Sequence, residues 1–352
     1  MLEIIRRHSF SIAFFALFAA IVFYESIEGA VIERFSGFTM GTSYEIQVVD
    51  IPISTNLSEL SGGIAELLLQ LDREVFSTYA EDSELSKFNK HGLNSPYTVS
   101  DDLFAVLRLS KEIATESGGV FDVTIGPVVN LWGFGPGSIA QGDLLPSDNA
   151  IKNAMTNVGV ENLILDTAKS EISKTKSIKI DLSGIAKGYA VDQVAVYLES
   201  HGVTNYFIEI GGEIKVSGLK PGNLDWVPAI ETPLDGPFKV YEVLTNRGEK
   251  IALAGSGDYR NFFELDGVRY SHEIDPRTGK PVSDVLAAAF VLDDSAARAD
   301  ALATALMVLG LEESRRLIER NNLKAFLIYR SESDEFNHYV SQDFDEYINR
   351  AF

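Results

Sequence analysis

The chain has 352 residues, of which 45% are hydrophobic and 23% charged, so it is long and apolar enough to fold around a sizeable core. Its formal net charge is −21, which makes nucleic acid and anionic membrane surfaces poor partners for the folded body. The absence of cysteine excludes a disulfide, a thiolate nucleophile and a metal site built on cysteine. An anionic ligand would need a local cation to offset the negative field of the protein.

The first 30 residues have the pattern of an export signal. The basic pair Arg6-Arg7 precedes a mostly apolar run from Phe10 to Tyr24, and small residues follow at Gly29-Ala30. A run of about 15 residues is short for a membrane span but fits the apolar part of a signal peptide. The pattern predicts an exported, periplasmic protein in which residues 1–30 are a signal peptide or an inner-membrane anchor held by residues 10–24. A buried N-terminal helix is the alternative, and a cysteine-linked lipid anchor is excluded.

Apolar periodicity along the rest of the chain predicts groups of consecutive strands separated by helices, an order typical of an α+β fold. The first two strands are predicted within residues 35–49, with a break at Gly41. Helices are predicted over residues 57–76, 100–118, 147–157, 183–202 and 295–309. The other strands are predicted at residues 120–125, 163–165, 171–173, 178–182, 206–210, 226–230, 239–243, 251–254, 286–292 and 324–329. Asp266-Gly267, between residues 262–265 and 268–271, predicts a β-hairpin.

A rigid turn follows His272. Pro276 fixes φ, Asp275 can bond its own backbone, and Gly279 permits a positive φ. A side chain on the shoulder of such a turn is held in place, as a catalytic proton carrier requires. The alternative is an ordinary surface turn with a solvated histidine.

Asp300 and Thr304 lie one turn apart on the helix predicted after Ser295, so their oxygens share one face. A carboxylate and a hydroxyl on one face suit a hard, oxygen-liking cation such as Mg²⁺. The neighbouring residues are apolar, so the helix is expected to be buried, where an unpaired aspartate would be costly. The alternative is an aspartate bonded to Thr304 or paired with Arg298.

The segment Asp181–Tyr189 lies at a predicted junction between a strand and a helix that Ser183 is expected to cap. Amide groups at a helix start, together with Lys187, favour a phosphate, and two glycines allow close backbone approach. The spacing is neither a Walker loop nor a dinucleotide fingerprint. The alternative is a helix start with a solvated lysine, and the small-residue turn at residues 253–261 is a weaker candidate for phosphate or ribose.

Several apolar and aromatic residues are open to two interpretations. Met40 and Tyr79 offer a surface on which a flat ring could stack, although on periodicity alone they are more often core residues. Trp132 and Phe134 are equally ambiguous.

Taken in order, these segments resemble the ApbE family of FAD:protein FMN transferases. The common order of the motifs, between about residues 33 and 330, is far more specific than any single motif. The resemblance implies an α+β body over residues 33–352, related to the T-fold, with two lobes and a nucleotide cleft between them. The motifs that carry it are Thr39–Thr42, Ser77–Tyr79, Gly119–Pro127, Leu131–Phe134, Asp181–Tyr189, Ile210–Glu213, Ser256–Arg260, His272–Gly279 and Ala299–Thr304.

The resemblance implies a Mg²⁺-dependent enzyme that splits FAD at its pyrophosphate, transfers FMN to a Thr or Ser hydroxyl of a target protein and releases AMP. The implied acceptors are membrane redox subunits, such as those of Na⁺-pumping quinone reductase and Rnf complexes. His272 is the implied general base. The implied metal ligands are the Gly184 carbonyl, Asp300 and Thr304. The residues implied to contact FAD are Met40, Tyr79, Val120, Phe121, Asp122, Asp181, Lys187 and Ile274.

Two other functions stay open. One is a Mg²⁺-dependent FAD pyrophosphatase, in which water rather than a protein hydroxyl attacks. The other is a periplasmic FAD-binding protein, against which the presence of His272 and of the Asp300/Thr304 pair argues. Glu273 stands where an apolar residue is expected in some members of the family, and its place before Ile274 predicts a side chain that points outward.

Overall fold

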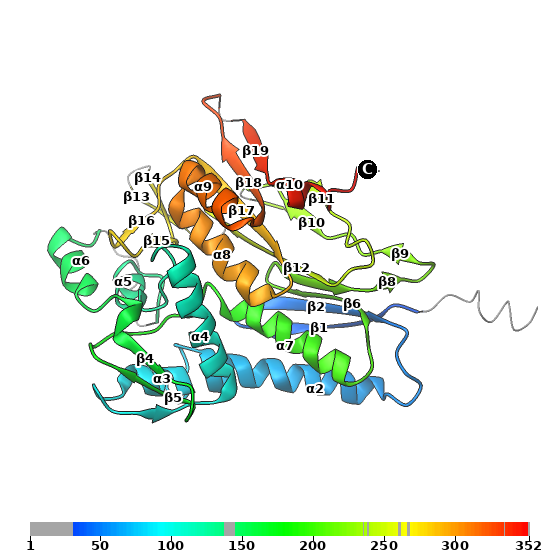
Figure 1. Cartoon of the computed structure of the whole chain (residues 1–352), viewed down its shortest axis with the longest axis horizontal. Coiled ribbons are helices and arrows are strands. Elements are labelled where there is room, and N and C mark those ends of the chain that lie inside the picture. Colours follow the sequence, from blue (N-terminus) through cyan, green and yellow to red (C-terminus); the bar gives the residue numbers. More distant parts are fainter. Residues whose placement is uncertain are drawn as a thin grey trace, which may run out of the picture.

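An eight-stranded sheet forms the centre of the fold (Figure 1). The computed structural model describes residues 31–350, apart from residues 137–144, 235, 238, 260–261, 266–267 and 334. All neighbouring strands of this sheet run antiparallel, in the order β1-β2-β6-β7-β12-β17-β18-β19. Their bounds are β1 Glu33–Thr39, β2 Thr42–Val49, β6 Asn205–Ile210, β7 Glu213–Ser217, β12 Ile251–Gly257, β17 Leu286–Asp293, β18 Lys324–Arg330 and β19 Phe336–Val340.

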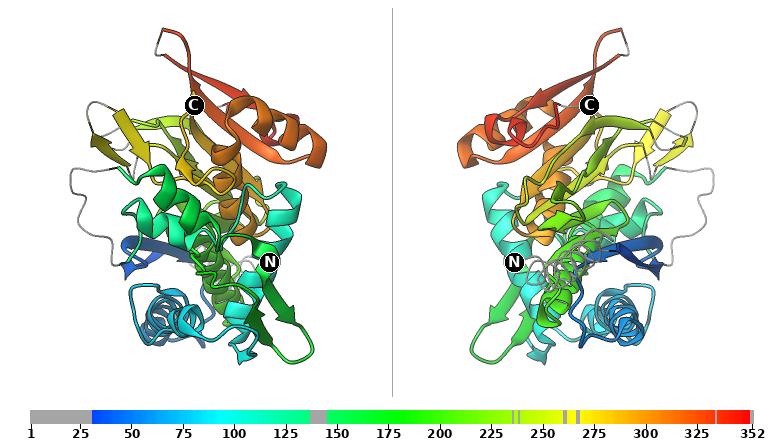
Figure 2. Two further views of the ribbon diagram at one scale, coloured as in Figure 1. Left: turned by 90° about the vertical axis from the view of Figure 1, so that its left-hand side faces the viewer. Right: turned by 90° about the vertical axis from the view of Figure 1, so that its right-hand side faces the viewer.

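Both faces of the central strands are buried, because successive side chains enter two different cores. In β12, Ala252 and Ala254 belong to the core beneath the long helices, whereas Ile251 and Leu253 belong to the core on the opposite face. The antiparallel pair β10 (Ala229–Glu231) and β11 (Val240–Val243), together with α10 (Gln342–Asp345), covers that opposite face. The hairpin of β18 and β19 extends from the end of the sheet (Figure 2).

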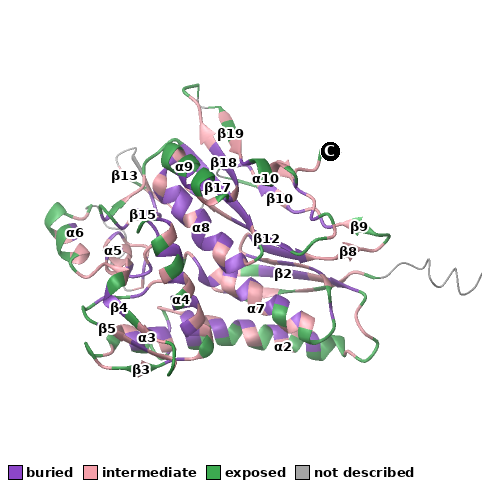
Figure 3. Cartoon of the chain, in the orientation of Figure 1, coloured by how far each residue is buried: buried purple, intermediate pink, exposed green. Residues whose placement is uncertain are grey.

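Two helices lie directly on the first face, α7 (Ala186–Ser200) and α8 (Ala296–Leu309). Helix α2 (Leu57–Leu69) packs on α7, and α4 (Asp101–Glu116) packs on α8. Helix α8 is rich in alanine and buried along most of its length, as predicted (Figure 3). A Cβ at Gly188 would lie 2.3 Å from the carbonyl oxygen of Ala296, so this glycine lets α7 and α8 approach closely beside the candidate site.

Shorter elements surround this core. A π-helix, Gln70–Phe76, continues α2, and a 3-10 turn spans Val160–Asn162. The remaining helices are α3 Glu84–Lys90, α5 Gly126–Leu131, α6 Asp148–Met155 and α9 Leu311–Asn321. The remaining strands form a small sheet of β3 (Tyr97–Thr98), β5 (Glu171–Lys174) and β4 (Leu163–Asp166), and the pairs β8 (Leu219–Lys220) with β9 (Leu224–Asp225), β13 (Phe262–Leu265) with β14 (Val268–Ser271), and β15 (Ile274–Asp275) with β16 (Lys280–Pro281).

The α+β class is confirmed, and most predicted elements appear within a few residues of their expected bounds. Strands β13 and β14 pair as the hairpin signal predicts, although the turn itself lies outside the described residues. The strand predicted from residue 226 begins only at Ala229, and β19 and α10 follow the strand that was expected to be the last. The predicted export signal, residues 1–30, also lies outside the described part. Within that part, no helix combines the length and apolar character needed to cross a membrane.

Two predicted strands are wrong, because side chains take up the backbone groups that a strand would use. Residues 120–125 form a turn in which the Asp122 carboxylate accepts hydrogen bonds from the N–H and hydroxyl of Thr124. Residues 178–182 form a loop. In this loop the side-chain amide of Asn89 accepts a hydrogen bond from the Ile180 N–H and donates one to the Ile180 carbonyl. The two segments are joined by an isolated bridge between Ile125 and Lys179 and by a hydrogen bond from the Asp181 N–H to the Val123 carbonyl, not by a strand ladder.

Two helix predictions also need correction. The helix expected over residues 57–76 is α-helical only to Leu69 and then widens into the π-helix. Ser183 does not cap α7, because its hydroxyl donates to Asp181 instead and the helix begins at Ala186.

Candidate active site

A cavity of about 740 Å³ lies where the start of α7 and the middle of α8 meet several loops. Its wall includes the turn between β1 and β2, the end of the π-helix, the loop at residues 120–125, the end of β12 and residues 272–276. The structure therefore brings together segments far apart in the sequence. All of the site residues that the resemblance implies line this cavity: Met40, Tyr79, Val120, Phe121, Asp122, Asp181, Gly184, Lys187, His272, Ile274, Asp300 and Thr304.

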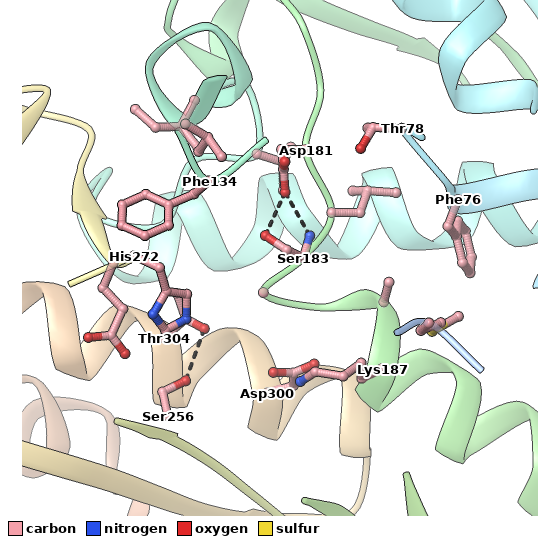
Figure 4. Close-up of a pocket in the computed structure, with 18 of the residues that line it drawn as sticks. Phe76, Thr78, Phe134, Asp181, Ser183, Lys187, Ser256, His272, Asp300 and Thr304 are labelled. Atoms are coloured by element: carbon pink, nitrogen blue, oxygen red, sulfur yellow. Dashed lines mark hydrogen bonds between the residues drawn. The ribbon is translucent and has the colours of Figure 1, made fainter. Parts of the chain in front are cut away.

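His272 lies in the wall of the cavity, between β14 and β15. It is half-buried, and the Phe134 ring stands nearly edge-on to its imidazole, with ring centroids 6.3 Å apart (Figure 4). The following turn is built as predicted: Asp275 accepts a hydrogen bond from the Arg277 N–H at 2.8 Å, and Gly279 has φ of +68°. A solvated surface histidine does not describe this position, because the imidazole faces a cavity and an aromatic ring.

Glu273 points inward, so the predicted outward orientation is wrong. Its side chain is 5% exposed and lines the cavity. The Ser271 hydroxyl donates to Oε2 at 3.1 Å, while Oε1 has no partner among the described residues. The prediction failed because side chains alternate between the two faces of a sheet only within a strand, and residues 272–273 lie between two strands. Burial raises the pKa of Glu273 to about 8, so its carboxyl is neutral at pH 7.

Asp300 is held on the buried side of the cavity by the contact between α7 and α8. The N–H of Gly188 donates to its Oδ2 at 3.0 Å. Neither alternative drawn from the sequence describes it, because Arg298 pairs with other carboxylates and Thr304 Oγ1 lies 3.2 Å from Ser256 Oγ. Burial raises the pKa of Asp300, and the Lys187 ammonium opposes that shift.

The backbone of Gly184 lies against Thr304, since a Cβ at position 184 would be 3.1 Å from Thr304 Oγ1. Among the described residues, no group of three His, Asp or Glu side chains could hold a metal ion. A cation here would thus be bound by Asp300, neutral oxygens of the protein and oxygens of a substrate. This set fits Mg²⁺, which keeps several waters and commonly binds through one or two carboxylates and phosphate oxygens.

Lys187 is paired rather than solvated. Its Nζ lies 2.7 Å from Glu213 Oε1, and the two side chains are 28% and 2% exposed. Burial raises the pKa of Glu213 to about 7, against the effect of the Lys187 ammonium. In the sequence, Glu213 stands at the end of a motif, and its place in the site was not predicted. The small-residue turn before β7 was the one local signal, because such turns often approach ligands.

The carboxylates of Asp122 and Asp181 fix the local backbone of the cavity wall. Asp122 accepts hydrogen bonds from Thr124 and, at 3.0 Å, from the N–H of Val160. Asp181 Oδ1 accepts from the N–H of Ser183 at 2.9 Å and from its hydroxyl at 2.6 Å (Figure 4). Burial raises the pKa of Asp122. Both aspartates therefore shape the loops on which their neighbours are presented.

Met40 and Tyr79 lie at the rim of the cavity. Met40 has φ of +47°, and its N–H donates to Asp72 Oδ2 at 3.1 Å. Tyr79 is 69% exposed, which excludes a core position, and its hydroxyl donates to the Phe134 carbonyl at 3.4 Å. Of the two ambiguous aromatic residues, Phe134 lines the cavity and Trp132 is buried in a core.

The turn at residues 253–261 contributes less than its small-residue composition suggested. Residues 253–257 belong to β12, and Ser256 lines the cavity beside Thr304. Arg260 lies outside the described residues.

Comparisons with known proteins agree with the motifs. The ApbE family model matches residues 40–327. The FAD:protein FMN transferase of Vibrio cholerae is 41% identical over 317 residues, which cover 90% of this chain and 92% of that protein. The protein of the same name from Haemophilus influenzae is 40% identical over 302 residues, 85% of this chain and 86% of that one. The solved structure of the flavin transferase ApbE from Vibrio cholerae superposes with a TM-score of 0.81 at 39% identity, over 90% of this chain and 99% of that one. The resemblance is confirmed: the chain belongs to the ApbE family.

Proposed function

We infer that the chain is an FAD:protein FMN transferase, an enzyme that attaches the FMN part of FAD covalently to a protein. The observation that carries this conclusion is the match to the family over residues 40–327, where the motifs converge on one cavity. Relatives at about 40% identity that cover most of the chain carry that name. The cavity holds a half-buried histidine, a lysine and a buried aspartate, which suit the positioning and charge neutralisation on which phosphoryl transfer depends.

We propose that the acceptor is a Thr or Ser hydroxyl and that His272 is the general base. His272 takes the hydroxyl proton, the hydroxyl oxygen forms a bond to the FMN phosphorus, and the phosphoanhydride P–O bond breaks. The electron pair of that bond leaves with AMP. The position of His272 in the cavity wall, beside the Phe134 ring, supports this role. An ordinary histidine pKa of about 6.5 suits proton removal near neutral pH.

We propose Mg²⁺ as the metal, bound by the Gly184 carbonyl, Asp300 and Thr304. When bound, Mg²⁺ neutralises charge on the diphosphate and on the oxygens around the reacting phosphorus. The buried Asp300 carboxylate and the close approach of Gly184 to Thr304 support this site. The net charge of −21 supports it too, because an anionic substrate needs a cation in this protein.

We propose that FAD occupies this cavity. Val120, Phe121 and Ile274 offer apolar contacts, Met40 and Tyr79 lie at the rim where a flat ring could stack, and Lys187 offers a charge for the diphosphate. The loops fixed by Asp122 and Asp181 present their backbone to the same cavity. A two-lobed body related to the T-fold, export to the periplasm and acceptors from Na⁺-pumping quinone reductase or Rnf complexes follow from the resemblance and the N-terminal pattern.

The test is to mix the purified protein with FAD, Mg²⁺ and a Thr-containing domain of such an acceptor, and to look for flavin fluorescence in a denaturing gel. We expect a fluorescent acceptor band that EDTA abolishes. Release of FMN and AMP without a labelled band would indicate a pyrophosphatase instead. Bound but intact FAD, with neither product, would indicate an FAD-binding protein.

A further inference from the structure

Lys187 lines the cavity next to Glu213, whose carboxylate is buried. Its ammonium is 2.7 Å from Glu213 Oε1, and it also interacts through space with Asp300 (Figure 4). The lysine side chain is 28% exposed, whereas the Glu213 side chain is 2% exposed. Both residues line the cavity, and the ammonium is the more exposed partner of the pair.

The glycine turn before β7 fixes the path of the Lys187 side chain. Gly211 has φ of +62°, and a Cβ there would lie 3.3 Å from Lys187 Cδ and 2.7 Å from Thr42 Cγ2. Because Gly211 has no side chain, the aliphatic part of Lys187 can pass close to this turn and reach Glu213. A buried ion pair is weak evidence for stability, because desolvation offsets much of the attraction. Its place in the wall of a substrate cavity points to a role in binding.

The charges of this cluster determine what it can bind. When ionised, Glu213, Lys187 and Asp300 together carry a single net negative charge. The diphosphate of FAD carries two negative charges, so the cluster repels FAD as long as the lysine charge is taken up by Glu213. A divalent cation on Asp300 reverses the sign of the cluster, and the repulsion becomes an attraction.

We propose that Glu213 is a positioning residue that makes FAD binding depend on the divalent cation, by holding Lys187 in an ion pair and so withholding its charge from the diphosphate. This inference rests on the proposed function, since it takes FAD as the ligand and Asp300 as a metal ligand. Glu213 acts through Lys187 and need not touch either ligand. The protein thereby has a lower affinity for FAD when the cation needed for transfer is absent.

Glu213→Gln removes the charge and keeps the shape of the side chain. Lys187 then becomes available to the diphosphate, so FAD should bind more tightly in the absence of metal. We expect the dissociation constant in EDTA to fall roughly tenfold or more, a change within the usual range of coupling between two sites. The ratio of the dissociation constants in EDTA and in Mg²⁺ should fall by a similar factor.

The experiment measures FAD affinity by quenching of flavin fluorescence, at pH 8, with either Mg²⁺ or EDTA. The matched control is Glu199→Gln. Glu199 also forms an ion pair with a lysine, Lys250, at 2.6 Å, but neither residue lines the cavity. It should leave both dissociation constants unchanged. Thermal unfolding of each variant establishes that it is folded.

A second comparison shows whether Glu213 acts through the lysine. In a Lys187→Met background, Glu213→Gln should no longer tighten metal-free binding. An equal gain in both backgrounds would contradict the positioning role.

The outcomes separate this inference from the function on which it rests. If the wild-type protein binds FAD more tightly with Mg²⁺ and Glu213→Gln keeps the same ratio, the inference is wrong and the transferase is unaffected. If the wild-type protein binds FAD equally in Mg²⁺ and EDTA, both the inference and the proposed metal site are wrong. If it does not bind FAD at all, the proposed function itself is overturned.

Discussion

Glu273→Gln should remove a large part of the pH dependence of folding stability. Burial raises the pKa of this carboxyl from 4.5 to about 8; the Ser271 hydroxyl opposes the shift, and the nearby Asp258 charge adds to it. Between these pKa values the unfolded chain releases the proton and the folded chain keeps it. The contribution of Glu273 is therefore fully present below pH 4.5 and is lost as pH rises to about 8. At ~1.4 kcal/mol per pH unit, the loss in free energy of unfolding is about 5 kcal/mol.

The assay is urea unfolding of the wild-type protein and the variant between pH 5 and 9, followed by fluorescence of the two tryptophans. Glutamine can accept the hydrogen bond from Ser271 and has no proton to lose, so the variant should become progressively more stable than the wild type as pH rises. Glu264→Gln, at an exposed position of β13, is the control and should follow the wild-type curve. A constant difference between wild type and Glu273→Gln across this range would refute the reasoning, because it would mean that Glu273 is ionised in the folded protein at neutral pH.

Three further predictions test the site and its support. His272→Ala should keep FAD binding and abolish transfer to the acceptor; undiminished labelling in the gel assay would remove His272 from the mechanism. Asp300→Ala should lose transfer together with its dependence on Mg²⁺, and transfer still stimulated by a Mg²⁺ titration would place the metal elsewhere. Gly188→Ala should lower the free energy of unfolding by ~1–3 kcal/mol or more, because its Cβ would lie 2.3 Å from the Ala296 carbonyl oxygen. Gly62→Ala, where a Cβ meets nothing within 4 Å, should be neutral or stabilising in the same thermal melts.

Long elements with clear periodicity could be predicted from the sequence. The alanine-rich helix after Ser295 was predicted with its cap and its burial, because Arg298, Asp300 and Thr304 are its only polar side chains. The segments at residues 120–125 and 178–182 could not be predicted. Both have apolar residues typical of strands, and only the three-dimensional structure shows that Asp122 and Asn89 bond their backbones. The Asn89 bonds join segments distant in the sequence, which a local pattern cannot reveal. The Asp122–Thr124 bond is local, but the apolar alternation of the same residues favoured a strand.

The membership of the site was predicted better than its electrostatics. Motif order identified residues that do line one cavity, because each motif belongs to a loop or helix end that faces it. The Lys187–Glu213 pair and the inward Glu273 were missed, because burial and pairing depend on contacts between segments that the sequence does not place together.

Burial gives the acidic groups of this cavity different charges at the same pH. Glu273 has a pKa of about 8 and stays neutral at pH 7, whereas Glu213, beside Lys187, has a pKa of about 7 and is close to its midpoint. The local charge that faces a diphosphate in this cavity therefore depends on Lys187, on pH and on the cation that we propose at Asp300. Raising the pH from 7 to 8 ionises more Glu213 and strengthens its hold on Lys187. Metal-free FAD binding by the wild-type protein should weaken over that range. In Glu213→Gln it should weaken less, because only Glu273, which ionises over the same range in both proteins, then adds negative charge to the cavity. Equal weakening in both proteins would show that another group sets the charge.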